Sequence, residues 1–372
     1  MEKEMGKMAE KNSEHERNGS LDFIKIVFTV LIVFHHYQQT LEVTFSQGVN
    51  YFNGKIYVGV IADCFFVISG FLMLKWTGII GSGQKEGELI PFMGKRLKRL
   101  VPMVLVTALC YEALCIIIFK LYPAENRIYI NFLTCFEAFL CLQCGWCFNN
   151  DMWVNSPTWY ISVLVLCYVI FYFVTALCRK KKYSLAAAYI AVVIIACGTD
   201  GFGINLPFLN AYSARGMRGF FVGLLLAMAD KSYDLHGTAQ IIICLAVCAI
   251  ASTGLLTDTV SVTVIVFPAV IVLMTVKPVK KLFSSKFWTV LGNIQFHVYL
   301  WHQTLLTLII LFGWMGHAPN VSSRITMYIF AAFAELFGAF SYFVLEKPAE
   351  KFLIMLLPKR ITPRKDKLND TL

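Results

Sequence analysis

Three titratable side chains stand within or beside strongly apolar stretches of this sequence. They are His36, Asp63 and His302. Ionisable groups inside membrane-spanning segments are rare and are functional candidates by default. A positioned imidazole can act as general base on a hydroxyl group, and a neighbouring carboxylate can orient it or balance its charge. The same residue types can also form a proton or substrate pathway through a membrane.

The spacing in the first apolar segment distinguishes two adjacent histidines. At about 100° per residue, four polar residues fall within roughly 60° of one another around a helix. They are Asp22, Lys25, Thr29 and His36. His35 is rotated by about 100° from His36, so it lies off this stripe. We therefore predict that His36 faces the bundle. The structural alternative for Asp22 and Lys25 is an ion pair at the inner membrane surface, and that for His36 is a histidine at the outer end of its helix.

The three titratable residues are predicted to lie at similar depths. His36 is about five residues, or roughly 7 Å, below the outer end of its segment, and Asp63 is at a similar depth on the next one. His302 is roughly 22 Å from the inner end of its segment, in the outer third of a ~30 Å hydrocarbon core. One polar layer near the outer face is thus expected to hold all three.

Three more polar residues lie in apolar segments. Gln295 precedes His302 by seven residues and so shares its helix face. Glu112 and Glu335 are carboxylates for which the sequence indicates no partner, and their roles stay open.

Two groups of residues at segment ends have both a structural and a functional interpretation. The basic run at 95–99 is typical of a cytoplasmic membrane anchor, and it could also bind the phosphates of a cytosolic ligand. Ser156 and Pro157 are good helix-start residues, while Trp159 and Tyr160 beside them could line a sugar site at the outer face.

Four of the twelve cysteines form a cluster, and the other eight are expected to pack as small hydrophobes. The cluster consists of Cys135, Cys141, Cys144 and Cys147. Its spacing is partly that of an iron–sulfur or zinc site, but the segment is apolar and no nearby histidine completes a ligand set. We predict no metal here; an external disulfide is the alternative.

The composition requires a membrane protein. Of 372 residues, 58% are hydrophobic and only 15% charged, which is too few polar side chains to cover a soluble body. The net charge of +10 comes from short basic clusters between apolar stretches, a pattern of membrane topology and not of nucleic-acid binding. We expect an all-α, polytopic transmembrane helix bundle. The apolar segments are 21–40, 57–76, 100–119, 129–147, 157–178, 183–198, 212–229, 237–255, 258–276, 287–312 and 324–346.

Basic residues assign a side to each segment. The clusters at 95–99 and 179–182 must both be cytoplasmic, so one of the three segments between them does not cross. The most polar, 129–147, is predicted to be re-entrant or interfacial. Ten spans remain, with 25 of 33 Lys and Arg residues inside and six outside. The expected organisation is a cytoplasmic tail (1–20), a transmembrane domain (21–352) and a basic cytoplasmic tail (353–372), in the cell membrane.

Six sequence motifs, in order, resemble those of the acyltransferase-3 family, the integral membrane O-acyltransferases of bacterial surface polysaccharides. The resemblance covers residues 21 to 352. The motifs are Lys25-x10-His36, preceded by Leu21-Asp22; Asp63-x-Phe65-Phe66-x-x-Ser69-Gly70-Phe71; Arg96-x2-Arg99-x2-Pro102; Arg215 with Arg218-Gly219-Phe220-Phe221-x-Gly223; Tyr299-Leu300-Trp301-His302; and Tyr342-x3-Glu346-Lys347-Pro348.

The sequence departs from the family pattern at two positions. Lys25 stands where arginine is commoner, which weakens any bidentate contact at this position. Leu164 stands where many members have glutamate, so a general acid or base is missing there. This favours the subgroup that lacks the carboxylate.

The resemblance implies transfer of an acyl group, expected to be acetyl, from cytosolic acyl-CoA to a hydroxyl of an exported glycan or glycolipid. His36, Asp63 and His302 are then the expected catalytic residues. The residues expected to bind the donor are Lys25, Arg96 and Arg99, and those expected to bind the acceptor are Trp159, Tyr160, Arg215 and Arg218. No cofactor or metal is expected beyond acyl-CoA as co-substrate; an acyl-histidine intermediate stays open. Expected partners are membrane lipids, with a second copy of the chain or polysaccharide-synthesis proteins open.

Two other functions compete with acyl transfer. A proton-coupled transporter of a lipid-linked sugar or organic anion would also need intramembrane ionisable residues. The absence of an evident internal repeat in the sequence counts against it. A purely structural partner of a polysaccharide synthase would need no ionisable residue at all.

The basic-residue asymmetry predicts ten spans with both termini in the cytoplasm. Reporter domains fused after Lys182 and after Lys281 should both read as cytoplasmic. An external signal at either junction would show that the number of preceding spans is wrong.

Overall fold

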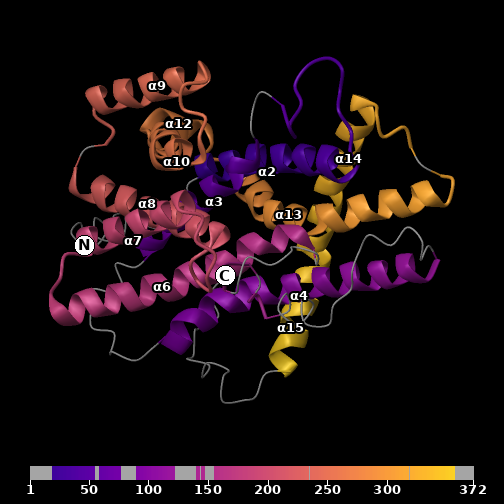
Figure 1. Ribbon diagram of the computed structural model, residues 1–372, viewed down its shortest axis with the longest axis horizontal. Coiled ribbons are helices and arrows are strands. Elements are labelled where there is room, and N and C mark those ends of the chain that lie inside the picture. The colour runs from indigo at the N-terminus through magenta and orange to yellow at the C-terminus, as the bar shows by residue number, and fades with distance from the viewer. Residues whose placement is uncertain are drawn as a thin grey trace, which may run out of the picture.

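The computed structural model describes residues 19–54, 58–76, 89–121, 140–142, 144–146, 155–233, 235–317 and 319–356. The regular elements within these ranges are all helices, which confirms the predicted all-α class. Figure 1 shows them as one packed group of rods. The α-helices are α2 (Gly19–Thr40), α3 (Ile61–Trp76), α4 (Leu89–Leu121), α6 (Trp159–Lys181), α7 (Leu185–Gly201), α8 (Ala211–Ser232), α9 (Thr238–Ser252), α10 (Thr259–Ser261), α11 (Phe267–Thr275), α12 (Lys277–Leu282), α13 (Lys286–Trp314), α14 (Arg324–Phe340) and α15 (Glu346–Leu356).

Ten of the eleven predicted apolar segments coincide with these helices. Within the described ranges, five helices are long and apolar enough to cross a membrane, and four shorter ones are apolar. The five are Gly19–Thr40, Leu100–Ile118, Ser156–Lys181, Lys286–Trp314 and Arg324–Lys351. The number of spans stays a prediction. Most of the predicted re-entrant segment 129–147 lies outside the described residues, as do 1–18 and 357–372 of the two predicted tails.

Helix α4 extends over basic residues that the hydropathy pattern placed outside a span. Helix α4 begins at Leu89, so the basic run at 95–99 lies on the helix and not in the loop before it. Arg215 and Arg218 lie within α8, as the predicted apolar segment 212–229 requires, although the tally of basic residues counted both among the six outside. Hydropathy averages over a window, and it therefore trims a helix wherever charges cluster near its end.

Glycines bring α3 and α8 into direct backbone contact. A methyl group added at Gly70 would lie 1.9 Å from the carbonyl oxygen of Phe220, and one at Gly223 would lie 2.1 Å from that of Val67. Small residues allow such close approach between membrane helices, where van der Waals packing drives association. The glycines in two of the family motifs are thus packing residues.

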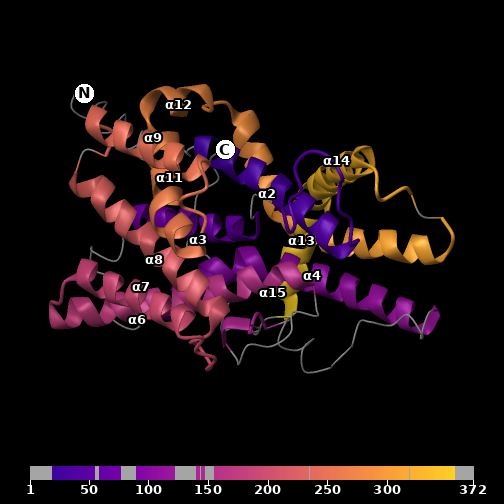
Figure 2. The same ribbon diagram turned by 45° about the horizontal axis from the view of Figure 1, so that its top comes forward.

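A second close helix pair consists of α2 and α13, which lie side by side (Figures 1 and 2). A methyl group at Gly292 would lie 2.5 Å from Cβ of Asp22, and the rings of His36 and His302 adjoin further along. Thr40 and Gln303 are hydrogen bonded beyond them, at 3.4 Å. Contacts therefore advance in the same direction along both helices, and the two helices run parallel.

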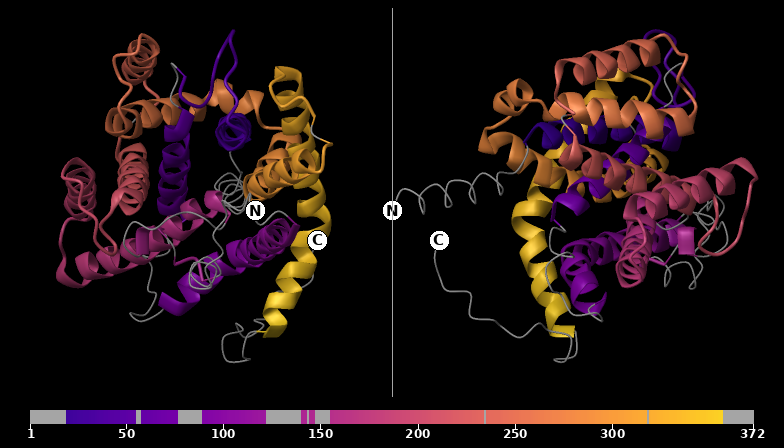
Figure 3. Two further views of the ribbon diagram at one scale, coloured as in Figure 1. Left: turned by 45° about the vertical axis from the view of Figure 1, so that its right-hand side comes forward. Right: turned by 90° about the vertical axis from the view of Figure 1, so that its left-hand side faces the viewer.

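The last helices form one continuous rod along one side of the molecule, drawn in yellow in Figure 3. A π-helical turn at Ser341–Leu345 joins α14 to α15, and a similar turn at Val262–Val266 joins α10 to α11. Helix α15 reaches α4, where Lys98 Nζ lies 3.3 Å from a carboxylate oxygen of Glu350. The rod thus connects α13 with the helix that carries the basic run.

The glycine contacts predict that Gly223→Ala destabilises the bundle, because the new methyl group meets backbone that cannot move aside. Overpacking of this kind typically costs about 1–3 kcal/mol. Gly198→Ala in α7 is the matched control, since its methyl group would meet only ring atoms of Phe202 at 3.9 Å. Thermal unfolding of both variants in the same detergent measures the difference. Equal unfolding temperatures would contradict the packing role.

Candidate functional site

His36 of α2 and His302 of α13 lie against each other, with their ring centroids 5.2 Å apart. His302 is fully buried, and its Nδ1 lies 3.2 Å from the carbonyl oxygen of Val298. Because a carbonyl oxygen can only accept, Nδ1 carries the hydrogen and Nε2 keeps its lone pair. That Nε2 atom is buried and has no hydrogen-bond partner among the described residues. The arrangement therefore presents an unused basic nitrogen beside His36.

In His36, as in His302, Nδ1 faces an oxygen atom. The Nδ1 atom of His36 lies 2.9 Å from Oε1 of Gln39. With the amide oxygen facing the ring, Nδ1–H donates and Nε2 remains as the basic nitrogen. The two imidazoles can thus both accept a proton or a hydrogen bond at Nε2.

His35 has different surroundings. Its Nδ1 lies 3.0 Å from the carbonyl oxygen of Tyr51, and its ring meets Phe52 edge to face at 5.3 Å. The loop that follows α2 therefore contacts His35, whereas His36 turns toward α13.

Asp63 is engaged elsewhere. Its fully buried carboxylate accepts from Arg215, with Nε at 2.8 Å and Nη2 at 2.6 Å from Oδ1. Thr263 Oγ1 donates to Oδ2 at 3.1 Å, and Arg218 Nη2 lies 3.7 Å from the same oxygen. Within the described part of the chain Asp63 has no hydrogen bond to a histidine. The structure thus brings His36 and His302 together but pairs Asp63 with the arginines of α8.

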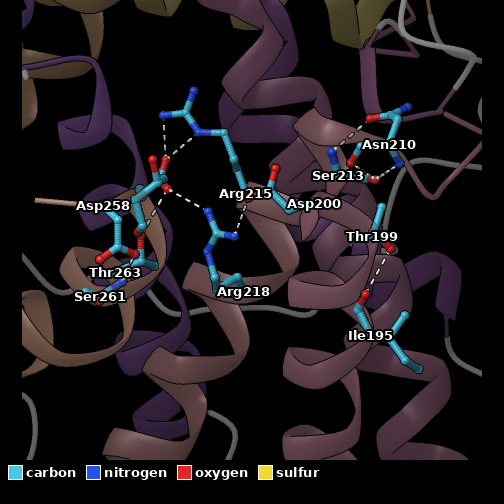
Figure 4. A network of polar contacts seen from close by, with 12 residues as sticks. Ile195, Thr199, Asp200, Asn210, Ser213, Arg215, Arg218, Asp258, Ser261 and Thr263 are labelled. Carbon is cyan, nitrogen blue, oxygen red and sulfur yellow. Dashed lines mark hydrogen bonds and ion pairs between the residues drawn. The ribbon is translucent and has the colours of Figure 1, made fainter. Parts of the chain in front are cut away.

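Arg218 bridges two acidic residues, as Figure 4 shows for its side near Asp200. The arginine is fully buried, and its Nη1 donates to Oδ2 of Asp200 at 2.8 Å. Asp200 lies in the last turn of α7, and its side chain is 35% exposed. Complete burial makes Arg218 a structural link among α3, α7 and α8 in this state, and direct contact with an acceptor would require it to rearrange.

Arg215 is more accessible than Arg218 and contacts Trp159, one of the two aromatic residues predicted to bind a sugar. Its side chain is 22% exposed, and its guanidinium carbon lies 5.0 Å from the centre of the Trp159 ring. Nη2 also donates to the carbonyl oxygen of Gly59 at 2.8 Å. A guanidinium on an indole face is a favourable cation–π arrangement. Two predicted acceptor residues, Arg215 and Trp159, are thus neighbours.

Aromatic rings connect this region with the histidine pair. The Tyr160 hydroxyl lies 3.2 Å from Oγ of Ser69, and its ring is 5.9 Å from that of Tyr299. The Tyr299 ring in turn lies 5.8 Å from that of His302, and its hydroxyl donates to the carbonyl oxygen of Pro157. The segment before α6 is therefore attached to the helix that carries His302.

The predicted donor residues lie on two helices. Lys25 Nζ is 3.0 Å from Oδ1 of Asp22, which is the ion pair foreseen as the structural alternative. Arg96 Nη2 lies 3.4 Å from Sδ of Met73, at the end of α3. The side chain of Arg99 lies outside the described residues.

The cysteine cluster is only partly described. Cys141 and Cys144 are buried, whereas Cys135 and Cys147 lie outside the described residues. Ser162 Oγ donates to the carbonyl oxygen of Cys141 at 2.9 Å, which ties this segment to α6. No group of three or more potential metal-binding side chains occurs in the described ranges.

Sequence reasoning missed a buried network around His297. Its Nδ1 lies 2.9 Å from Oγ of Ser341, which also accepts from Trp301 Nε1 at 2.8 Å. Its Nε2 faces Oε2 of Glu346 at 3.8 Å. The available signals were a histidine in an apolar segment and the glutamate of the last motif. Two further partners were also missed, because neither belongs to a motif: Thr263, which donates to Asp63, and Asp200, which accepts from Arg218.

The family model of an acyltransferase domain matches residues 18–344, a range that contains the histidine pair and the buried arginines. The chain belongs to the acyltransferase-3 family. As a member it is a membrane acyltransferase, which agrees with its apolar helices. Searches among curated proteins and among solved structures gave no match.

The environment of Asp63 predicts that Asp63→Asn destabilises this acyltransferase strongly. Removing one partner of a buried ion pair typically costs about 3–5 kcal/mol, because the other charge stays buried without compensation. Asp200→Asn is the control: it keeps an oxygen acceptor for Arg218 at a site that is 35% exposed, so a smaller loss is expected. Thermal unfolding in detergent compares the two. If Asp63→Asn unfolds no more easily than Asp200→Asn, the carboxylate does not hold the arginines together.

Proposed function

We propose that this acyltransferase moves an acetyl group from cytosolic acetyl-CoA to a hydroxyl of an exported glycan or glycolipid, with His36 as the general base. The observation that carries the proposal is the pair of adjacent imidazoles, each with Nδ1–H given to an oxygen and with Nε2 available. A neutral imidazole with an available nitrogen is the usual general base for a hydroxyl nucleophile.

The reaction can be written with few proton transfers. His36 Nε2 removes the hydrogen of the acceptor hydroxyl while the oxygen attacks the thioester carbonyl. The tetrahedral intermediate then expels the thiolate, the carbon–sulfur bond breaks, and the imidazolium returns the proton to sulfur. The products are the acetyl ester and CoA, and His36 is neutral again. His302 Nε2 is a second acceptor beside it, suited to hold a neighbouring hydroxyl of the glycan.

We assign Asp63 an indirect role in place of the expected contact with His36. It fixes Arg215 by two contacts to one oxygen, and Arg215 lies on the face of Trp159. A partly exposed guanidinium and an indole suit the hydroxyl groups and the apolar face of a sugar ring. We propose that Trp159, Tyr160 and Arg215 bind the acceptor and that Arg218 positions Asp63.

The donor is proposed to bind at the inner end of α4. Arg96 and Arg99 belong to a basic run on the helix, and guanidinium groups suit phosphate oxygens. Lys98 in the same run pairs with Glu350 of α15. Lys25, paired with Asp22 at the start of α2, is a secondary candidate for the donor phosphates. This proposal requires that the protein lies in the cell membrane with both termini in the cytoplasm.

Acyl transfer is tested directly with the purified protein in lipid nanodiscs, radiolabelled acetyl-CoA and a panel of glycans and lipid-linked sugars. Appearance of label in a glycan supports the proposal. Uptake of an intact sugar or anion into liposomes without acylation would favour the transporter instead. The family membership supports acyl transfer over that alternative.

The two adjacent histidines give the sharpest prediction for catalysis. Loss of a general base typically lowers a rate about 10²–10⁴-fold, so His36→Ala should remove nearly all transfer while the protein still inserts. His35→Ala should stay within about tenfold of the wild-type rate, because in this mechanism His35 does not remove the proton from the acceptor hydroxyl. Initial rates at saturating acetyl-CoA provide the comparison. The reverse pattern would make His35 the base, and full activity in both variants would exclude histidine catalysis in α2.

A further inference from the structure

A buried amide and the carboxyl group of a half-buried glutamate meet between α13 and α14. Gln295 Nε2 donates to Oε2 of Glu335 at 2.9 Å and lies 3.3 Å from the carbonyl oxygen of Leu291. Both hydrogens of the amide nitrogen therefore have acceptors. The two remaining oxygens, Oε1 of Gln295 and Oε1 of Glu335, are buried and lack hydrogen-bond partners among the described residues.

An ionised carboxylate fits these surroundings poorly. A carboxylate can only accept, so neither orphan oxygen would obtain a donor. A buried charge also needs an opposite charge or several hydrogen bonds.

The titratable and charged groups on the neighbouring helices are committed elsewhere. On α2, Lys25 pairs with Asp22, while His35 and Tyr37 bond to backbone carbonyls. His36 and His302 adjoin each other, Tyr299 bonds to Pro157, and His297 lies between Ser341 and Glu346. On α14, Arg324 stacks on Phe45, and Tyr328 packs against Phe34. None of these provides Glu335 with a counter-ion.

One added proton satisfies both orphan oxygens. A protonated carboxyl group has an O–H donor, and a carboxylic acid and a primary amide can exchange two hydrogen bonds in a ring. We propose that Glu335 and Gln295 form an intramembrane proton-binding site, in which Glu335 is a neutral acid that donates its O–H to the amide oxygen of Gln295. The proposal does not depend on the acyl transfer reaction.

The ligand is a proton and not a metal ion. Hard cations such as Ca²⁺ and Mg²⁺ take six or more oxygen ligands, whereas two orphan oxygens are available here. No cluster of three or more potential metal ligands occurs in the described ranges. A proton needs only one donor–acceptor pair.

Along the axis of α13, the site lies closer to the N-terminus of the helix than the histidine pair does. Gln295 precedes His302 by seven residues on α13, which corresponds to about two turns or roughly 10 Å along the axis. Glu335 is partly exposed on α14, a helix whose outer face is apolar. A small apolar reagent dissolved in the lipid can therefore reach the carboxyl group from the side.

Dicyclohexylcarbodiimide in nanodiscs at neutral pH tests for the protonated acid. The O–H of a carboxylic acid adds across one C=N bond to give an O-acylisourea, which rearranges to a stable N-acylurea with no atom lost. Peptide mass spectrometry should find this adduct on Glu335. Glu335→Gln is the matched control, because it keeps the neutral shape and both ring hydrogen bonds. It should give no adduct at residue 335 and should unfold at nearly the wild-type temperature.

Infrared difference spectra between the wild type and Glu335→Gln provide a second readout that needs no access for a reagent. The wild type should show the carbonyl stretch of a protonated acid, and Gln295→Leu should move that band to higher frequency by removing its hydrogen bonds. Carboxylate bands in place of the acid band would overturn the proposal. So would a strongly lowered unfolding temperature in Glu335→Gln, or protection from the carbodiimide by sodium but not by choline, which would indicate a metal ion.

Discussion

The cost of placing a polar group in hydrocarbon governs which side chains of this acyltransferase can react. A buried polar atom without a partner costs several kcal/mol in a membrane, so most buried polar groups form a hydrogen bond or an ion pair. Asp63 is held by two arginines and a threonine, and His297 by a serine and a glutamate. His302 Nε2 is the fully buried imidazole nitrogen left without a partner in the described chain. Reactivity is thus concentrated where pairing is incomplete.

The same constraint gives several family motifs a structural cause. In the motif from Asp63 to Phe71, the aspartate balances the charge of Arg215 on α8. Gly70 of the same motif lets the backbone of α8 approach closely. In the motif that begins at Arg218, the arginine forms an ion pair with Asp63, and Gly223 packs against the backbone of Val67. Both motifs describe one helix contact seen from its two sides. Their residues support the site by fixing where Arg215 and Trp159 stand.

The positions of the helices could be predicted from the sequence, but their partners could not. Apolar length and the 100° helical period locate each segment and place His36 on its stripe, because both depend on neighbours along the chain. Asp63 shared a predicted depth with His36, yet depth does not determine which helix lies alongside; its partners come from α8 and from Thr263. For the same reason the pairing of Glu335 with Gln295, forty residues away, left no trace in either segment. The extension of α4 to Leu89 was hidden by its own charges.

The π-helical turn at Ser341–Leu345 has a consequence for changes in chain length. A π turn contains one residue more than an α-helical turn, so α15 is rotated by about 100° relative to an uninterrupted continuation of α14. This rotation helps to bring Glu346 to His297 and Glu350 to Lys98. Deleting one residue within the turn would restore a regular helix and turn both glutamates away together. A single-residue deletion in the middle of this rod is therefore a change of direction for everything beyond it, whereas the same deletion in a surface loop shortens only the loop.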